Sequence, residues 1–133
     1  MQFSFSKMNS QGNDFVIIDN TSQNIVLSEY LVRKISSDVT TSCDQILLID
    51  VDSPINVQCK IYNQDGSEAY QCGNGMRAIM SFLNKHYDYR EAVIFVNHIP
   101  YMIDYHNDSN IRVNMGPPDF LAETTKSSNM KNL

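Results

Sequence analysis

The stretch that decides the fold is residues 62–77, which read YNQDGSEAYQCGNGMR. Cys72 stands between a turn-forming segment and a segment whose apolar residues have the i, i+3, i+4, i+7 spacing of an amphipathic helix, namely Met76, Ile79, Met80 and Leu83. We therefore expect Cys72 near the N-terminus of a helix at about residues 74–86, where free N–H groups and the macrodipole favour negative charge. A thiol there can have a pKa well below the usual value of about 8.5. A thiolate beside glycines that let a small anion approach indicates a proton-transfer or acyl-transfer site.

The three cysteines differ in their surroundings. A lone cysteine most often fills space in a core, and Cys59 fits that interpretation because it lies in the apolar-rich run 57–62. Cys43 is intermediate, since it adjoins the polar pair Asp44-Gln45 ahead of a strand-like run. Three cysteines without CxxC spacing do not indicate a disulfide framework. They favour a reducing cytoplasm, which would keep Cys72 free.

Length, composition and charge exclude several classes of protein. A chain of 133 residues with 42% hydrophobic residues fits one domain with a real core. The net charge of −5 and the lack of a basic run argue against a nucleic-acid partner. The longest apolar stretches fall short of a membrane span, and Met1–Lys7 lacks the pattern of a secretory leader. We expect a cytoplasmic protein without a membrane partner.

Nothing in the sequence points to a metal or an organic cofactor. The three histidines lack metal-ligand spacing with any cysteine. Gly73-Asn74-Gly75 is not followed by the Gly-Lys-Ser/Thr of a phosphate-binding loop, and no lysine is marked out as a pyridoxal site. We therefore predict chemistry that uses side chains alone.

The periodicity predicts an α+β fold, a mostly antiparallel sheet packed with two helices. The predicted helices are residues 28–35, capped by Ser28, and about 74–86. The predicted strands are residues 3–6, 16–19, 46–51, 57–62, 92–96, 101–105 and 111–115, with a turn at 64–67. We expect one domain over residues 1–119 and a polar tail, or a truncated connection to an absent second domain, over 120–133.

Four stretches, in order, resemble the N-terminal half of diaminopimelate epimerase, a cofactor-independent amino-acid epimerase. They are Lys7-Met8 with Gly12-Asn13-Asp14-Phe15-Val16, Asp44-Gln45, residues 62–68 running into Gln71-Cys72-Gly73-Asn74-Gly75, and Arg112-Val113-Asn114-Met115-Gly116. The resemblance implies one half of a two-domain, pseudo-twofold enzyme that converts LL- to meso-2,6-diaminopimelate for lysine and peptidoglycan precursor synthesis. Each half of such an enzyme gives one catalytic cysteine, and the substrate lies in the cleft between the halves.

By this resemblance Cys72 is one of two acid/base groups. The positions that match substrate contacts are Asn13, Gln45, Asn63, Gly73 and Asn74. Side-chain amides both donate and accept hydrogen bonds, which suits a zwitterionic amino acid. Without the resemblance, the same asparagines would be interpreted as turn and capping residues.

The chain also departs from the family pattern. Asn9-Ser10-Gln11-Gly12 stands where the family usually has His-Gly-x-Gly, and the approach to Asp44 over residues 37–43 has no glycine. No second Cys-Gly-x-Gly occurs, nor the family's Glu-Arg pair. Two alternatives therefore stay open: a catalytically impaired or non-catalytic domain that binds a partner subunit, and another cofactor-independent amino-acid racemase. A second domain or a second copy of the chain is the expected partner.

Overall fold

The computed structural model describes residues 3–70 and 73–114. The elements are β1 (Ser6–Ser10), β2 (Asn13–Asp19), α1 (Glu29–Ser37), β3 (Gln45–Ser53), β4 (Asn56–Asn63), β5 (Glu68–Ala69), α2 (Gly73–Tyr87), β6 (Glu91–Val96), β7 (Ile99–Asn107) and β8 (Asn110–Asn114). The predicted α+β class is confirmed. The predicted boundary at residue 119 and the polar tail lie outside the described residues.

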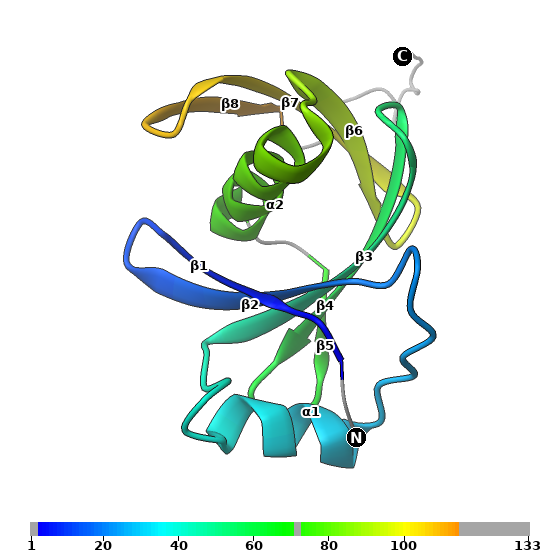
Figure 1. Cartoon of the computed structure of the whole chain (residues 1–133), viewed down its shortest axis with the longest axis vertical. Coiled ribbons are helices and arrows are strands. Elements are labelled where there is room, and N and C mark those ends of the chain that lie inside the picture. Colours follow the sequence, from blue (N-terminus) through cyan, green and yellow to red (C-terminus); the bar gives the residue numbers. More distant parts are fainter. Residues whose placement is uncertain (1–2, 71–72, 115–133) are drawn as a thin grey trace, which may run out of the picture.

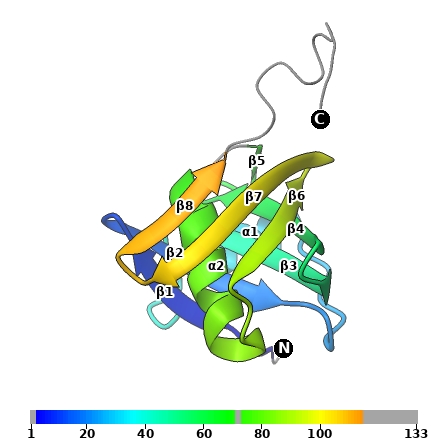
Figure 2. The ribbon, with the colours of Figure 1, turned by 90° about the horizontal axis from the view of Figure 1, so that it is seen from above.

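The strands form one curled sheet in the order β1-β2-β3-β4-β6-β7-β8, with β5 paired to the end of β4. Within the described chain, β2–β3 and β4–β6 are the parallel pairs and the other neighbours are antiparallel. A parallel pair needs a long crossover, and α2 provides it between β4 and β6. In Figure 1, α2 lies between β6–β8 on one side and β1–β4 on the other. Figure 2 shows β6, β7 and β8 crossing over the helix.

The core has two clusters because the strands bury both faces. The inner cluster surrounds α2, whose buried apolar side chains pack against inward residues of the sheet such as Phe15, Leu47, Ile61, Ile94 and Ile103. The outer cluster lies between α1 and the sheet and holds Val16, Ile18, Val32, Ile35, Cys43 and Ile46. Successive β2 residues therefore alternate between the two clusters, as strand geometry requires.

In the N-terminal part of the chain, the predicted helix cap is confirmed and the predicted first strand is wrong. Ser28 is the N-cap of α1, and its Oγ accepts a hydrogen bond from the Leu31 N–H at 3.1 Å. The predicted strand at residues 3–6 is wrong, because the edge strand is Ser6–Ser10 and pairs Met8 with Phe15. Phe3 instead packs against the outer cluster, with its ring centroid 5.6 Å from that of Phe5. Phe5 is exposed, so the apolar alternation at residues 3–6 does not mark a strand.

A hydrogen-bonded group ties the C-terminus of α2 to the end of β2. The Tyr87 hydroxyl donates to Asp19 Oδ2, and Asp19 Oδ1 accepts from the Thr21 N–H and hydroxyl at 3.0 and 2.5 Å. The Thr21 hydroxyl oxygen accepts in turn from the Val51 N–H at 2.9 Å. Burial first, and then the hydrogen bond to Asp19, raise the pKa of Tyr87.

We expect Tyr87→Phe to lower the free energy of unfolding by about 2 kcal/mol at neutral pH, the usual value of a hydrogen bond to a charged group. A tyrosine pKa raised by folding gives stability that is present below the unfolded pKa of about 10 and is lost above it. The difference between wild type and variant should therefore shrink above pH 10 in urea unfolding. Tyr89→Phe is the matched control, because the ring of Tyr89 is a 5.4 Å neighbour of the Tyr87 ring. Equal losses in both variants would contradict the role of Asp19.

Candidate active site

Three of the side chains predicted to contact the substrate lie at one end of three adjacent strands. Asn13 begins β2, Gln45 begins β3 and Asn63 ends β4. The register pairs Gln45 with Phe15 on one side and with Asn63 on the other. Gln45 Nε2 donates to Asn63 Oδ1 at 2.9 Å, and all three side chains are half-buried. We call Asn13, Gln45 and Asn63 the amide row.

The turn after Asn63 is built from its own side chains, as predicted for residues 64–67. Asp65 Oδ1 accepts from the Ser67 hydroxyl at 2.6 Å and from the Ser67 N–H at 2.9 Å. These hydrogen bonds, the side-chain one foremost, lower the pKa of Asp65. Asn63 Nδ2 donates to Ser67 Oγ at 3.1 Å, and the Asn63 carbonyl accepts from the Gly66 N–H at 3.0 Å. The amide of Asn63 is thus fixed by Gln45 on one side and Ser67 on the other.

Gly66 brings this turn into close contact with α1. Its φ of +94° lies in the left-handed region that favours glycine. A Cβ at this position would lie 2.3 Å from Glu29 Cγ and 2.9 Å from the Glu29 carbonyl oxygen. Both the backbone conformation and the space therefore require glycine, and the turn rests directly on the first residue of α1.

A second link joins the starts of β2 and β3. The Asp14 N–H donates to Asp44 Oδ2 at 2.7 Å, and the Asp44 N–H donates to the Asp14 carbonyl at 2.8 Å. Asn9 Nδ2 donates to Asp14 Oδ1 at 2.9 Å, which adds the end of β1. The sequence marked Asp44 as part of a polar pair and of a stretch that resembles the family, but gave it no role of its own. The signal in the sequence that could have indicated this link is that Asp14 directly follows Asn13 and Asp44 directly precedes Gln45.

The chain then turns back toward α2. β5 runs antiparallel to the end of β4, pairing Glu68 with Tyr62, and α2 begins shortly afterwards at Gly73. Gly73 and Asn74 are half-buried in the first turn of α2, which carries no acidic side chain. The buried Tyr101 hydroxyl donates to the Tyr70 carbonyl at 3.3 Å, fixing the chain just ahead of the helix. Cys72, the predicted catalytic residue, lies outside the described residues.

The other two cysteines, Cys43 and Cys59, are both buried. Cys59 belongs to the inner cluster, which confirms its interpretation as a core residue. Cys43 belongs to the outer cluster, and burial is the main cause that raises the pKa of its thiol. A buried thiol with a raised pKa is a poor nucleophile or base at neutral pH. Cys43 therefore does not fit a reactive site, and Cys59 is enclosed in the core.

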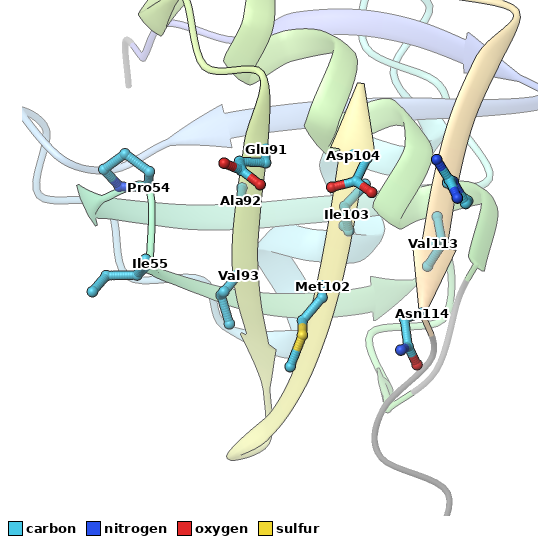
Figure 3. Close-up of a pocket in the computed structure, with 11 residues that line it drawn as sticks. Pro54, Ile55, Glu91, Ala92, Val93, Met102, Ile103, Asp104, Val113 and Asn114 are labelled. Carbon is cyan, nitrogen blue, oxygen red and sulfur yellow. The ribbon is translucent and has the colours of Figure 1, made fainter. Parts of the chain in front are cut away.

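Figure 3 shows a groove of about 790 Å³, none of whose lining residues belongs to the amide row. It is lined by the outward residues of β6, β7 and β8, among them Glu91, Val93, Met102 and Asp104, and by Pro54 and Ile55. Pro54 and Ile55 follow β3 at the end of the β3–β4 hairpin opposite Gln45. The groove and the amide row are therefore separate features of the molecule.

Residues 3–70 and 73–114 contain no group of three or more His, Cys, Asp or Glu side chains arranged to hold a metal ion. Neither described helix has the length and apolar character that crossing a membrane requires.

Residues 5–121 match the family model described as diaminopimelate epimerase. The chain belongs to the diaminopimelate epimerase family. That family is one of isomerases. The match covers the strands that carry the amide row, the start of α2 and the chain between them.

Two curated members of the diaminopimelate epimerase family are similar to this chain in sequence. The diaminopimelate epimerase of Blochmanniella pennsylvanica is 43% identical over 123 residues, and that of Blochmanniella floridana is 38% identical over 121 residues. Each comparison covers 87% of this chain and 44% of the relative. The chain therefore spans less than half the length of these relatives.

Solved structures show the same fold at low sequence identity. A predicted epimerase from Pseudomonas aeruginosa superposes with a TM-score of 0.64 at 9% identity, covering 83% of this chain and 41% of that one. A phenazine biosynthesis protein of the PhzF family from Enterococcus faecalis gives a TM-score of 0.62 at 11% identity, covering 80% and 42%. The eight-stranded sheet around α2 thus corresponds to half of the fold that these proteins share with the diaminopimelate epimerase family.

Proposed function

We propose that this chain supplies one half of a diaminopimelate epimerase active site. In this proposal Cys72 is one of two acid/base groups, and Asn13, Gln45, Asn63, Gly73 and Asn74 contact the substrate. The observation that carries the proposal is the amide row, since the fold gathers three of these side chains at one end of the sheet. Family membership supports it independently.

The chemistry needs a group on each face of the α-carbon. The Cys72 thiolate would take the α-proton and become a thiol, leaving the electron pair on the substrate as a carbanion. A second thiol on the opposite face would deliver its proton to that carbon and become a thiolate. The exchange balances without an oxidant or an organic cofactor, and general acid–base catalysis of this kind accelerates a reaction by about 10²- to 10⁴-fold per group.

The substrate carboxylate and the developing negative charge would be stabilised at the start of α2. The N–H groups of a helix's first turn have no partner within the helix, and the macrodipole is positive there. The first turn of α2 has no acidic side chain to compete for this position. The amides of Gln45 and Asn63 supply polar atoms for the ammonium group of the substrate.

The second acid/base group must come from elsewhere. It belongs either to a second domain, equivalent to the part of the relatives that this chain does not match, or to a second copy of this chain. A monomer therefore has a base on one face only. We expect it to exchange the α-proton with solvent and to give little or no inversion.

Proton NMR of LL- and meso-diaminopimelate in D2O tests the proposal directly. The expected result is loss of an α-proton signal that depends on Cys72, without conversion between epimers when sedimentation shows a monomer. Conversion accompanied by dimer formation would identify a second copy as the source of the opposite acid. If a panel of other amino acids exchanges instead, the chain acts as a different racemase. No exchange above a Cys72→Ala control would overturn the proposal and favour a non-catalytic domain that binds a partner.

A further inference from the structure

Gln64 makes a contact that extends the link between β3 and β4 beyond the last strand pair. The register between these strands ends at Gln45 and Asn63. Past that pair, Gln64 Nε2 donates to the Cys43 carbonyl at 2.9 Å in a part-buried hydrogen bond. The two neighbouring amides therefore hold the first residue of β3 and the backbone shortly ahead of that strand. Asn63 contacts the side chain of Gln45, and Gln64 contacts the backbone just before it.

The segment that Gln64 contacts has no glycine to set its path. Residues 37–43 lead from α1 to β3, and Thr41 fixes their middle by donating from Oγ1 to the Ile35 carbonyl at 2.6 Å. The side chain of Cys43 is buried in the outer cluster. Asp44 is held by Asp14. The Gln64 contact links this segment to the turn that follows Asn63.

We propose that Gln64 is a positioning residue of the amide row, which sets the direction of the Gln45 side chain through the Cys43 carbonyl. This assignment rests on the proposed function for its catalytic meaning. Gln64 is an exposed residue, and its amide reaches the backbone of Cys43, 21 positions earlier in the chain, through a part-buried hydrogen bond. A shift of about 1 Å in a substrate-binding group can cost as much as 100-fold in rate, so the orientation of Gln45 bears on turnover.

The test compares Gln64→Met with Gln58→Met by NMR. Methionine keeps the length of the side chain and removes the donor. Gln58 is the matched control, because it is an exposed glutamine of β4 whose Nε2 donates to Asn56 Oδ1 at 2.8 Å, away from the amide row. We expect the side-chain ¹H–¹⁵N amide signals of Gln45 and Asn63 to shift in Gln64→Met and to stay in place in Gln58→Met. Gln64→Glu should behave like Gln64→Met, since a carboxylate cannot donate to a carbonyl.

The same variants are then compared in the diaminopimelate exchange experiment. We expect exchange to fall by ~5- to 10-fold in Gln64→Met, as the loss of one hydrogen bond predicts. Unchanged Gln45 and Asn63 signals in both Gln64 variants would overturn the positioning role. The side-chain amide signals can be measured without any turnover. If the wild-type chain shows no exchange, that result overturns the proposed function and leaves the positioning role of Gln64 to be decided by the amide signals.

Discussion

Gly66→Ala is expected to lower the free energy of unfolding by about 3 kcal/mol, which combines ~1–2 kcal/mol for a left-handed alanine with ~1–3 kcal/mol for overpacking. The overpacking arises because the added Cβ would meet the Glu29 side chain and, at 2.9 Å, the Glu29 carbonyl oxygen. The side chain can move aside at little cost, whereas the backbone oxygen belongs to α1 and cannot. Thermal unfolding measured by circular dichroism should show a midpoint lowered by roughly 10 °C.

Gly12→Ala separates the two contributions. Gly12 has a φ of +89°, close to that of Gly66, but a Cβ built there meets nothing within 4 Å. We expect Gly12→Ala to cost about 1 kcal/mol, the backbone contribution alone. Glu29→Ala in the Gly66→Ala background should recover little of the loss, because it removes only the flexible Cγ contact and leaves the carbonyl contact in place. Equal losses for Gly12→Ala and Gly66→Ala would show that the contact with α1 carries no energy.

Cys72→Ala is expected to reduce α-proton exchange of diaminopimelate by at least ~100-fold, the usual effect of removing a general base. Cys59→Ala is the matched control. Cys59 is a buried member of the inner cluster, so its loss should lower stability while the folded chain keeps its exchange rate. Alkylation by iodoacetamide adds a measurement that needs no substrate. The folded wild-type chain should have one fast-reacting thiol, and the folded Cys72→Ala variant should have none, since Cys43 and Cys59 are both buried.

Two results would contradict this prediction. Exchange that persists in Cys72→Ala would remove the thiol from the proposed mechanism. A folded Cys59→Ala that loses exchange as completely as Cys72→Ala would show that the assay reports integrity of the core rather than a base.

The sequence predicted those elements whose pattern is dictated by burial alone. The runs at 46–51, 57–62 and 92–96 are apolar because their strands contribute to the buried clusters, and each lies within the observed β3, β4 or β6. β5 was missed because two residues, Glu68 and Ala69, become a strand only through pairing with β4. β1 was misplaced because its alternating pattern, from Ser6 to Ser10, holds a single apolar residue.

The candidate site, too, was predicted only in part. The members of the amide row were named through resemblance, and their meeting at one edge depends on the parallel pairing of β2 with β3. The residues that support the row were not predicted. Asp44 and Gln64 find their partners 30 and 21 positions away in the chain. Such partners follow from strand register, which no local pattern determines.

The enclosure of α2 by a single curled sheet has a consequence for folding kinetics. One inner cluster combines residues from β2, β3 and β4 before the helix with residues from β6, β7 and β8 after it. The helix cannot bury its circumference until strands from both sides of the sequence have closed around it, and the parallel β4–β6 pair forms only across that helix. Contacts of such long sequence separation slow the search for the native state to roughly milliseconds to seconds. We therefore expect all-or-none folding, in which the strands before α2 and those after it acquire structure together.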